Sequence, residues 1–454
     1  MSLTIVVLAA GQGTRMRSEL PKVMHPLAGR PMVHFVIDAA RALEPALLAV
    51  VVGYGQEQVR AALGDGVAYA VQAEQLGTGH ALLQARSQVE GRGDSVLVLY
   101  GDSPLIRPET LRRMVERHEG AGAAVTLLTF SPPDPVGYGR VVRDAEGGGV
   151  VAVVEEEEAT PRQRLIGEVN SGILCFRDAW LWSHLPRVER SAGGEVYLTD
   201  LIAAASAGGE AVAALKVDDP LEVMGVDNRL KLASAEAEMR RRINERWMWE
   251  GVTFIDPATT YVEAGVEIGR DSVIWPNSLL QGQTRIGRAC TIGPGSLVRD
   301  STVGDGCRVE LSVVESAIME EGSDVGPFGH LRKGAHLGPG AHMGNFGEVK
   351  NSYLGAGVKM GHFSYLGDAT VGDGANIGAG TITCNYDGRQ KHPTIIGQGA
   401  FIGSDTMLVA PVEVGDGAKT GAGSVVTRDV PAGGLAYGVP ARSRPAAGRD
   451  DSEE

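Results

Sequence analysis

The feature that most constrains this chain is an apolar residue that returns every six positions in its carboxyl-terminal half. The clearest run comprises Val325, Leu331, Leu337, Met343 and Val349. A period of six fits neither an α-helix, with 3.6 residues per turn, nor a single strand with alternating side chains. It is typical of a parallel β-helix of hexapeptide repeats, in which three hexads complete a triangular turn and each apolar residue points to the axis.

The same period continues on both sides of this run. Further apolar hexad positions are Ile268, Ile274, Leu280, Ile286, Ile292 and Val298 before it, and Leu354, Met360, Leu366, Val371, Ile377, Ile396, Ile402, Leu408 and Val414 after it. The chain has 63 glycines in 454 residues, about twice the usual share. Glycine after many of the apolar residues accounts for this excess, because glycine permits a tight corner.

The hexad period is interrupted once, between Ile382 and Ile395. The intervening residues 383–394 are polar and rich in turn formers. A repeat coil expels such an insertion as a loop on one face, and loops of this kind often carry function. We therefore expect residues 383–394 to form an active-site loop.

Charge and cysteine content exclude several classes of protein. The net charge of −14 argues against nucleic-acid binding, although backbone amides and a few cations can still bind phosphates. The four cysteines, Cys175, Cys290, Cys307 and Cys384, lie far apart and form no C-x-x-C motif, so neither a zinc site nor a disulfide framework is indicated. No signal peptide and no bilayer-spanning stretch is evident. These features predict a soluble cytoplasmic protein.

The amino-terminal part begins with a buried-type strand, residues 3–10, that runs into a turn containing Gly11 and Gly13. A glycine-rich turn between a strand and a helix presents backbone N–H groups to phosphate. This turn lacks the end of a Walker A loop and the third glycine of a dinucleotide fingerprint, so an ordinary βα turn is the alternative. Arg15 and Lys22 nearby favour a cationic clamp on a triphosphate.

Two later stretches suggest the rest of a nucleotide site. Residues 95–102 form an apolar strand that ends in Asp102, at the edge where open α/β sheets bind ligands. A carboxylate in a phosphate site is usually a Mg²⁺ ligand, and the alternative is an Asp that caps the next helix. Residues 71–81 combine Gln72 with a Gly77-Thr78-Gly79 turn, which suits recognition of a base edge. A hairpin or helix start without function is the alternative there.

Together these motifs resemble the sugar-nucleotide pyrophosphorylase family. The resemblance rests on residues 8–16, Pro21-Lys22, Gln72, residues 77–79, 100–102, 137–140 and 154–155, and residues 168–173 and 225–229. With the hexapeptide repeats attached, the chain to about Val430 is similar to the family of bifunctional N-acetylglucosamine-1-phosphate uridyltransferase/glucosamine-1-phosphate acetyltransferases of bacterial cell-wall precursor synthesis. This implies an α/β nucleotidyltransferase domain with a Rossmann-like mixed sheet, followed by a left-handed parallel β-helix.

The resemblance assigns uridyltransferase roles by position. Arg15 and Lys22 are the expected catalytic cations, and Mg²⁺ is the expected cofactor, with Asp102 and Asp227 as its ligands. The family more often has Asn at the second position, and Asp is an equally good oxygen ligand. The expected substrate contacts are Leu8, Ala10, Gly11, Gly13, Lys22, Gln72, Gly77, Thr78, Tyr100, Gly139, Glu155 and Asn170. Of these, the resemblance assigns Gly139, Glu155 and Asn170 to the amino sugar and its ribose neighbour. Residues 156–158 are three further Glu, which we expect to form a solvated face.

The resemblance also assigns an acetyltransferase site to the β-helix. His362 is the expected general base, because histidine can take a proton from an ammonium group near neutral pH, and Asn385 or Glu348 would orient it. The expected contacts to the sugar phosphate are Arg332, Lys350, Tyr365, Asn376, Asn385 and Tyr386. The expected contacts to the co-substrate acetyl-CoA are Ala379, Ser404, Ala422 and Arg442. His330 and the tail around Arg442 depart from the family pattern.

The sequence also suggests a division into parts. Residues 1–228 are the expected uridyltransferase domain, residues 229–250 a helical linker arm, and residues 251–437 the β-helix acetyltransferase domain. Residues 438–454 form a tail, and we expect its acidic end, residues 448–454, to be disordered. Family members pack three β-helices in parallel, which implies a homotrimer with acetyl-transfer sites between subunits.

Two other functions stay open at this stage. One is a single-activity sugar-1-phosphate nucleotidyltransferase whose β-helix serves only oligomerisation or regulation, and the His362 segment argues against it. The other is a non-catalytic assembly protein, which would not need Lys22, Asp102 and Asp227 together. The bifunctional reading implies UTP, glucosamine-1-phosphate, N-acetylglucosamine-1-phosphate and acetyl-CoA as substrates, with no nucleic acid or membrane partner.

Overall fold

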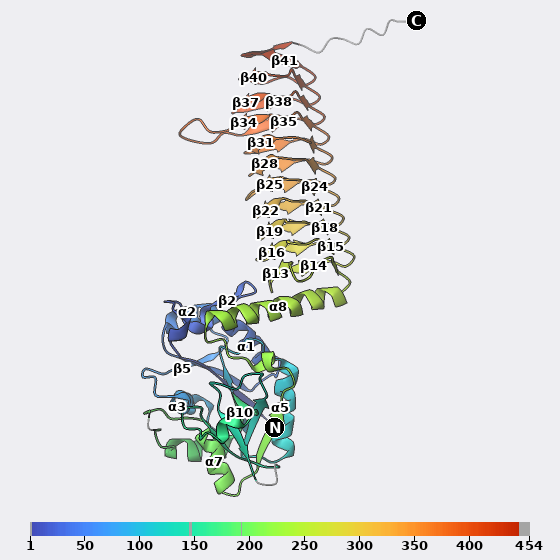
Figure 1. Ribbon diagram of the computed structural model, residues 1–454. Helices are drawn as coiled ribbons and strands as arrows, with labels where there is room; N and C mark the ends of the chain where they lie inside the picture. Colours follow the sequence, from blue (N-terminus) through green and yellow to red (C-terminus); the bar gives the residue numbers. More distant parts are fainter. Residues whose placement is uncertain (1, 145–147, 192, 445–454) are drawn as a thin grey trace. The chain divides into compact units, whose positions relative to one another are not determined.

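The computed structural model describes residues 2–144, 148–191 and 193–444 (Figure 1). The chain forms two compact units, Met1–Met239 and Arg240–Glu454, and each is described by itself. The predicted disordered end, residues 448–454, lies outside the described residues. In the part of the chain that the structure describes, no helix is long and apolar enough to cross a membrane.

The amino-terminal unit is built on a mixed sheet with the strand order β11-β7-β10-β6-β1-β4-β5. Its strands are β1 (Leu3–Ala9), β4 (Leu47–Val52), β5 (Ala68–Val71), β6 (Ser95–Tyr100), β7 (Val125–Phe130), β8 (Arg140–Arg143), β9 (Val150–Val154), β10 (Val169–Arg177) and β11 (Val212–Lys216). Along this order β10 is antiparallel to both of its neighbours, and the other pairs are parallel. The hairpin of β8 and β9 joins the sheet through β10. The predicted Rossmann-like mixed sheet is confirmed.

Helices cover both faces of this sheet. They are α1 (Met32–Arg41), α2 (Gln56–Leu63), α3 (Thr78–Gln84), α4 (Arg86–Val89), α5 (Pro108–Gly120), α6 (Asp178–His184) and α7 (Asp200–Ala207). Because side chains alternate along a strand, β1 feeds two cores. Val6 and Leu8 pack with residues of α3, α6 and α7, whereas Ile5 and Val7 pack with residues of α1, α2 and α5.

Short elements and one long helix complete this part of the chain. The short elements are η1 (Thr14–Met16), η2 (Lys22–Met24), β2 (Pro26–Leu27), β3 (Arg30–Pro31), η3 (Gln163–Leu165), η4 (Leu185–Arg187) and η5 (Pro220–Val223). Helix α8 (Arg229–Trp249) occupies the stretch in which the sequence predicted a helical arm. The boundary between the two compact units falls inside this helix, after Met239.

The carboxyl-terminal unit is a parallel β-helix whose strands stack into three faces. Face one comprises β12 (Thr253–Phe254), β15 (Val273–Ile274), β18 (Thr291–Ile292), β21 (Arg308–Val309), β24 (Asp324–Val325), β27 (His342–Met343), β30 (Lys359–Met360), β33 (Asn376–Ile377), β36 (Phe401–Ile402), β39 (Lys419–Thr420), β41 (Leu435–Gly438) and β42 (Ala441–Arg444). Strand β42 turns back antiparallel to β41, so the predicted tail begins with ordered structure.

The other two faces follow in the same order along each coil. Face two comprises β13 (Tyr261–Val262), β16 (Leu279–Gln281), β19 (Leu297–Arg299), β22 (Val313–Glu315), β25 (His330–Leu331), β28 (Gly347–Lys350), β31 (Ser364–Gly367), β34 (Ile382–Cys384), β37 (Met407–Val409) and β40 (Val425–Val426). Face three comprises β14 (Glu267–Ile268), β17 (Arg285–Ile286), β20 (Thr302–Val303), β23 (Ile318–Met319), β26 (His336–Leu337), β29 (Tyr353–Leu354), β32 (Ala369–Val371), β35 (Thr394–Ile396) and β38 (Val412–Val414).

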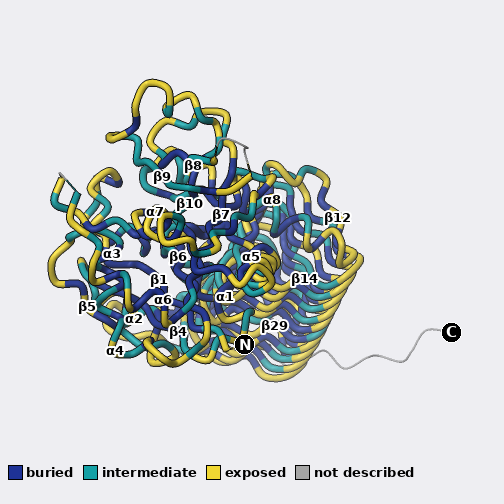
Figure 2. Tube along the Cα trace, turned by 90° about the horizontal axis from the view of Figure 1, so that it is seen from below, coloured by how far each residue is buried: buried dark blue, intermediate teal, exposed yellow. Residues whose placement is uncertain are grey.

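The core of the β-helix confirms the hexad period. Every apolar hexad position given above is at most 6 % exposed, and Figure 2 shows the buried inner side of the stacked coils. The interruption is shorter than predicted, because Thr383 is 1 % exposed and takes the inward position on face two. Ile382 faces outward beside Tyr365 and Met407. The expelled loop therefore runs over residues 385–393, between β34 and β35.

The inward positions predict a sharp contrast between adjacent residues of one strand. In β18, Ile292 is fully buried whereas Thr291 faces outward and is partly exposed. We expect Ile292→Ala to destabilise the β-helix by about 2–4 kcal/mol, since it removes buried methyl groups and leaves a cavity. The control Thr291→Ala should change stability by less than about 0.5 kcal/mol. Denaturant unfolding of the two full-length variants measures both; equal losses would contradict this account of the core.

Candidate active sites

A pocket of about 290 Å³ opens at the carboxyl ends of the parallel strands β1 and β6. It is lined by Leu8, Ala9, Ala10, Gly11, Lys22, Val23, Gln72, Gln75, Gly77, Thr78, Ala81, Tyr100, Asp102 and Glu195. Most of the residues predicted for the nucleotide therefore lie around one cavity, because parallel strands bring the loops that follow them to one edge. The sequence analysis did not predict Gln75 or Glu195. Gln75 lies in the same amide-rich stretch as Gln72, and Glu195 carried no signal.

The turn after β1 is shaped by glycine at one position. Gly13 has φ +70°, and a Cβ there would lie 2.5 Å from the Cβ of Lys22. A side chain at Gly13 would thus be strained and would push Lys22 away. Glycine allows the backbone of the turn to lie directly against the lysine stem, which brings backbone N–H groups and an ammonium group to the same wall of the pocket.

Two carboxylates at this edge of the sheet form ion pairs with three cations. The Lys22 ammonium group forms an ion pair with Asp102 Oδ2. Arg15 Nη1 lies 3.0 Å and Lys231 Nζ 3.2 Å from Asp227 Oδ2. The N–H of Val226 donates to the carbonyl of Asp102 at 2.7 Å, so the segments that carry both carboxylates are adjacent. The four predicted charged residues are therefore neighbours.

The donors present suit a hard cation such as Mg²⁺. Asp102 and Asp227 offer carboxylate oxygens, which are the ligands that this ion prefers. Among the described residues, no group of three or more His, Cys, Asp or Glu side chains is arranged to hold a metal. A magnesium ion at Asp102 and Asp227 would therefore complete its coordination with phosphate oxygens and water, as is usual for sites that act on nucleotides.

The residues predicted for the sugar come together beside this pocket. The N–H of Asn170 donates to the carbonyl of Gly139 at 2.9 Å. A Cβ at Gly139 would lie 3.1 Å from Glu155 Oε2, and Thr199 Oγ1 donates to Glu155 Oε1 at 2.9 Å. Burial raises the pKa of Glu155, and the nearby carboxylate of Asp200 adds to this rise. Asn170 Oδ1 is buried without a hydrogen-bond partner among the described residues, so an acceptor is left for a ligand.

The expectation of a solvated face for residues 156–158 is wrong at Glu156. Its Oε2 lies 2.7 Å from Nη2 of Arg140, whose side chain is 1 % exposed. The acidic run therefore begins with two residues that face the interior, Glu155 and Glu156, before the exposed Glu157 and Glu158. The run of identical Glu residues gives no sign of this difference in exposure, because Glu156 pairs with a buried arginine that lies on another strand.

In the β-helix, one corner collects His362 with three of the residues predicted for acetyl-CoA. The corner joins faces one and two. There the N–H of Gly380 donates to Phe363 O at 2.6 Å, that of Asp405 to Ala379 O at 2.6 Å, and that of Gly423 to Ser404 O at 2.8 Å. His362, Ala379, Ser404 and Ala422 thus form a column over four successive coils, which we call the histidine column. His362 is exposed, and Asn376 lies on the adjoining strand β33.

The opposite edge of face two carries a second cluster. Here Arg332 Nη1 lies 2.7 Å from Glu348 Oε1, and Asn385 Nδ2 donates to Asp368 Oδ2 at 2.5 Å. Lys391, which was not among the predicted site residues, lies in the expelled loop with its Nζ 3.9 Å from Asp368 Oδ2.

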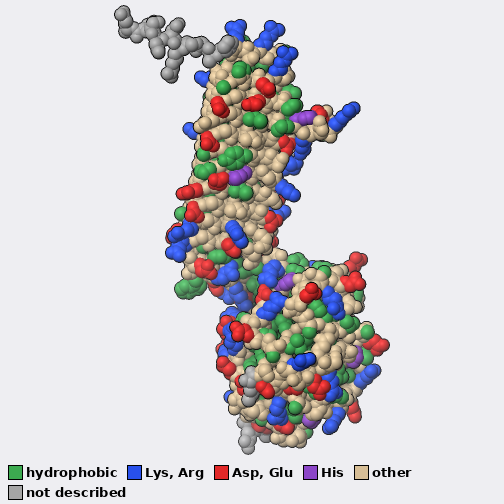
Figure 3. Space-filling view, turned by 180° about the vertical axis from the view of Figure 1, so that it is seen from behind, with side chains coloured by type: hydrophobic (Ala, Val, Ile, Leu, Met, Phe, Trp, Pro, Cys, Tyr) green, Lys and Arg blue, Asp and Glu red, His purple; other side chains and the backbone are tan. Residues whose placement is uncertain are grey.

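Lysine and arginine charges gather at this second edge. The nearby Lys391 lowers the pKa of Lys350, so the two ammonium groups are close. The hydroxyl of Tyr365 and the amide of Asn385 both lie over Gly367. We call Arg332, Lys350, Tyr365, Asn385 and Lys391 the cation edge. The loop that carries Lys391 projects from the β-helix with basic side chains, as Figure 3 shows, and Tyr386 in it is 61 % exposed.

One chain does not bring the predicted base to its predicted orienting partners. His362 precedes β31 and Asn385 contacts Asp368, which follows β31. The four residues of strand β31 alone span about 13 Å between the two ends of this path. Glu348 is engaged with Arg332, and no hydrogen bond joins His362 to either residue within the described part of the chain. Arg442, on β42 at the last coil, is also exposed.

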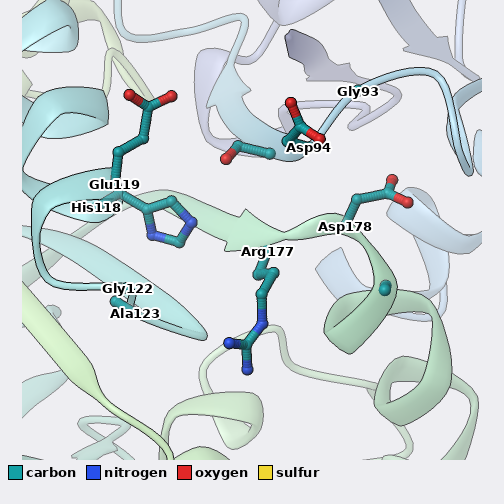
Figure 4. Close-up of a pocket in the computed structure, with 10 residues that line it drawn as sticks. Gly93, Asp94, His118, Glu119, Gly122, Ala123, Arg177 and Asp178 are labelled. Atoms are coloured by element: carbon teal, nitrogen blue, oxygen red, sulfur yellow. The ribbon is translucent and has the colours of Figure 1, made fainter. Parts of the chain in front are cut away.

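A second cavity in the amino-terminal unit, of about 350 Å³, lies at the opposite edge of the sheet (Figure 4). Three of its charged groups, Asp94, Arg177 and Asp178, already have partners within the unit. Arg177 forms an ion pair with Glu210 at 2.5 Å, Asp178 accepts from Gly91 N–H and from Trp182 Nε1, and Asp94 accepts from Ser2 N–H. Burial lowers the pKa of His118 to about 4, so its imidazole is neutral. These paired charges favour a structural role over catalysis.

Comparisons with known proteins agree with this arrangement. Residues 5–158 match the MobA-like NTP transferase domain, and residues 265–300 and 393–428 match the bacterial transferase hexapeptide repeats. The Bifunctional protein GlmU of Shouchella clausii is 45% identical, over 97% of this chain and 96% of the relative. The proteins of the same name from Heliobacterium modesticaldum and Pelotomaculum thermopropionicum are 48% and 51% identical, over 95% and 91% of this chain and 94% and 90% of theirs. The chain therefore belongs to the bifunctional GlmU family.

Proposed function

We propose that this chain catalyses two successive steps of UDP-N-acetylglucosamine synthesis. The β-helix transfers an acetyl group from acetyl-CoA to glucosamine-1-phosphate, and the amino-terminal unit then transfers a uridylyl group from UTP to the product, releasing pyrophosphate. The observation that carries the proposal is that a chain similar to bifunctional relatives over nearly its whole length holds both a cation-and-carboxylate pocket and a histidine column. A β-helix used only for oligomerisation would not need the column.

Uridylyl transfer asks the protein mainly to position charged groups. A phosphate oxygen of the sugar phosphate attacks the α-phosphorus of UTP in line, and the bond to pyrophosphate breaks. The backbone around Gly11 and the cations Lys22 and Arg15 hold the triphosphate and balance its charge. In the free protein these cations are paired with Asp102 and Asp227. Magnesium bound by these carboxylates would neutralise phosphate charge and leave the cations for the nucleotide.

Acetyl transfer asks for a base and for an anion site. His362 takes a proton from the ammonium group of the sugar, and the amine then attacks the thioester carbonyl of acetyl-CoA. The new C–N bond replaces the C–S bond. Of the two protons that the nitrogen loses, one passes from His362 to the leaving thiolate and the other passes to solvent. The small residues of the histidine column leave room for the pantetheine arm. Lys350, Lys391 and Arg332 at the cation edge suit the phosphate of the sugar.

The same proposal includes a homotrimer, because the two halves of the acetyltransferase site lie at opposite edges of face two. The outward residues of that face are mostly apolar, and they include Tyr261, Leu279, Leu297, Val313, Ile382, Met407 and Val425. At the adjoining corner Phe328 and Phe346 stack at 5.2 Å although they are 53 % and 61 % exposed. Such a surface suits contact with other copies of the chain, which would bring one copy's histidine column to another's cation edge.

A cytoplasmic location belongs to this proposal as well. All four cysteines are free, including the partly exposed Cys384. Unpaired cysteines are typical of proteins in a reducing compartment.

The two activities should separate by mutation. With Mg²⁺, UTP, acetyl-CoA and glucosamine-1-phosphate supplied, we expect wild type to release both free thiol and pyrophosphate. Asp102→Ala should keep thiol release and lower pyrophosphate release at least about 100-fold. His362→Ala should lower both, by about 10²–10⁴-fold in the acetyl step, and recover pyrophosphate release when N-acetylglucosamine-1-phosphate is added. Pyrophosphate without any thiol from wild type would favour the single-activity alternative.

Glu155→Gln should stabilise the protein at neutral pH and weaken sugar binding. The fold raises the pKa of this carboxyl, so its ionised form is disfavoured in the native state. The stability conferred by its protonated form is lost as pH rises from the ordinary Glu range through the raised pKa. The variant should therefore melt above wild type at neutral pH, and the two should converge at pH values below the ordinary Glu pKa. Its KM for N-acetylglucosamine-1-phosphate should rise by about tenfold or more. A variant that melts below wild type at neutral pH would contradict this.

The trimer can be tested on the stacked aromatic pair. Phe346→Ser should shift the protein toward monomers and reduce thiol release, while pyrophosphate release from N-acetylglucosamine-1-phosphate stays near wild type. The matched control is Ile318→Ser, at a 45 % exposed residue on face three. Sedimentation velocity reports the assembly state. A trimeric Phe346→Ser protein with full acetyl transfer would show that this corner is not the interface.

A further inference from the structure

Arg140, the first residue of β8, carries a charged side chain that is only 1 % exposed and takes no part in the steps proposed above. Its Nη2 lies 2.7 Å from Glu156 Oε2, and its Nη1 donates to the carbonyl of Tyr138. Its Nε is buried without a partner among the described residues. Burying a guanidinium group with one unpartnered nitrogen lowers the stability of the folded domain. Replacing such an ion pair by apolar residues is often neutral or stabilising. Stability alone is therefore a weak reason for its presence.

The Arg140–Glu156 pair fixes a stretch of backbone from two directions. Arg140 holds the carbonyl of Tyr138, and the same Glu156 oxygen accepts from the N–H of Gly137 at 3.3 Å. The stretch of residues 137–139 contains two glycines, and Gly137 has φ +85°. Such a stretch has much conformational freedom to lose. The ion pair supplies the contacts that hold it in one conformation.

This stretch ends at the proposed sugar subsite. The carbonyl of Gly139 accepts from the N–H of Asn170 at 2.9 Å, and the Glu155 carboxylate lies against the α-carbon of Gly139. Glu155 and Glu156 are consecutive, with Glu155 beside Gly139 and Glu156 on Arg140. A movement of Glu156 therefore moves both the backbone of Gly139 and the side chain of Glu155.

We infer that Arg140 and Glu156 are a positioning pair that holds the backbone of the sugar-1-phosphate subsite in place. The inference rests on the proposed uridyltransferase function and adds residues that would touch neither substrate. The nucleotide side of the pocket is built from β1, β6 and the residues 72–81, and none of these contacts the pair in the hydrogen bonds and ion pairs of the described residues. Loss of the pair should therefore weaken the use of the sugar phosphate much more than the use of UTP.

Two variants test this on the full-length protein. Glu156→Gln keeps the shape and removes the charge, but it leaves a buried guanidinium group without its counter-charge. The double variant Arg140→Met/Glu156→Leu removes both charges together, so it keeps the test valid where the single variant fails to fold. The control is Glu210→Gln, which breaks the Arg177–Glu210 pair at the other end of β10. Thiol release by the β-helix is an internal control in every sample.

We expect the double variant to melt near wild type and to lose about 10- to 100-fold in kcat/KM for N-acetylglucosamine-1-phosphate, mainly through KM. Its KM for UTP should stay within about twofold of wild type, and Glu210→Gln should leave both KM values unchanged. Equal rises in the two KM values, or an unchanged KM for the sugar phosphate, would show that the pair is only structural. Absence of pyrophosphate from wild type would instead refute the proposed function before any variant is compared.

Discussion

Burial of one inward side chain in every hexad is the interaction on which the carboxyl-terminal unit depends. Each hexad directs one side chain to the axis. These inward side chains fill the inside of the coil and are almost fully buried. Because the coils stack in register, residues 17 to 25 positions apart in the chain come to lie one above another, as His362, Ala379 and Ser404 do. The outward side chains do not pack in the core, so functional groups at these positions do not disturb core packing. The histidine column and the cation edge are two uses of that freedom.

The amino-terminal unit places its site by the same geometric rule applied to a sheet. Parallel strands end at one edge, and the turns after β1 and β6 bring Lys22 and Asp102 into contact. The cations and carboxylates of this pocket form ion pairs with each other. A bound triphosphate would replace the carboxylates as the negative partner of the cations. A bound metal ion would replace the cations as the positive partner of the carboxylates. The pocket thus holds charges that suit these ligands, and its cations and carboxylates also balance each other.

Ion pairs between oppositely charged side chains have different roles in the two units. In the β-helix, His330, His336 and His342 lie on three different faces, and each pairs with a carboxylate one coil below at a partly exposed surface. These pairs lie on the outside of the coil, and their presence does not depend on one specific side-chain conformation. Arg140 is buried in the amino-terminal unit, and with Glu156 it holds backbone that leads to the proposed sugar subsite. Their value lies in the geometry that they enforce, which is why we place them in the reaction and leave the surface pairs out of it.

The sequence by itself determined the repeat fold and the kinds of chemistry. A period of six is typical of a parallel β-helix, and the residues near β1 and β6 predicted groups for phosphate and metal binding, because the carboxyl ends of parallel strands lie at one sheet edge. Only the tertiary structure decided three things. It showed that Thr383 and not Ile382 is inward, that Glu156 turns to a buried Arg140, and that His362 and Asn385 lie at opposite edges of face two. Each of these depends on a partner distant in the chain, and such partners leave no trace in the local pattern of residues.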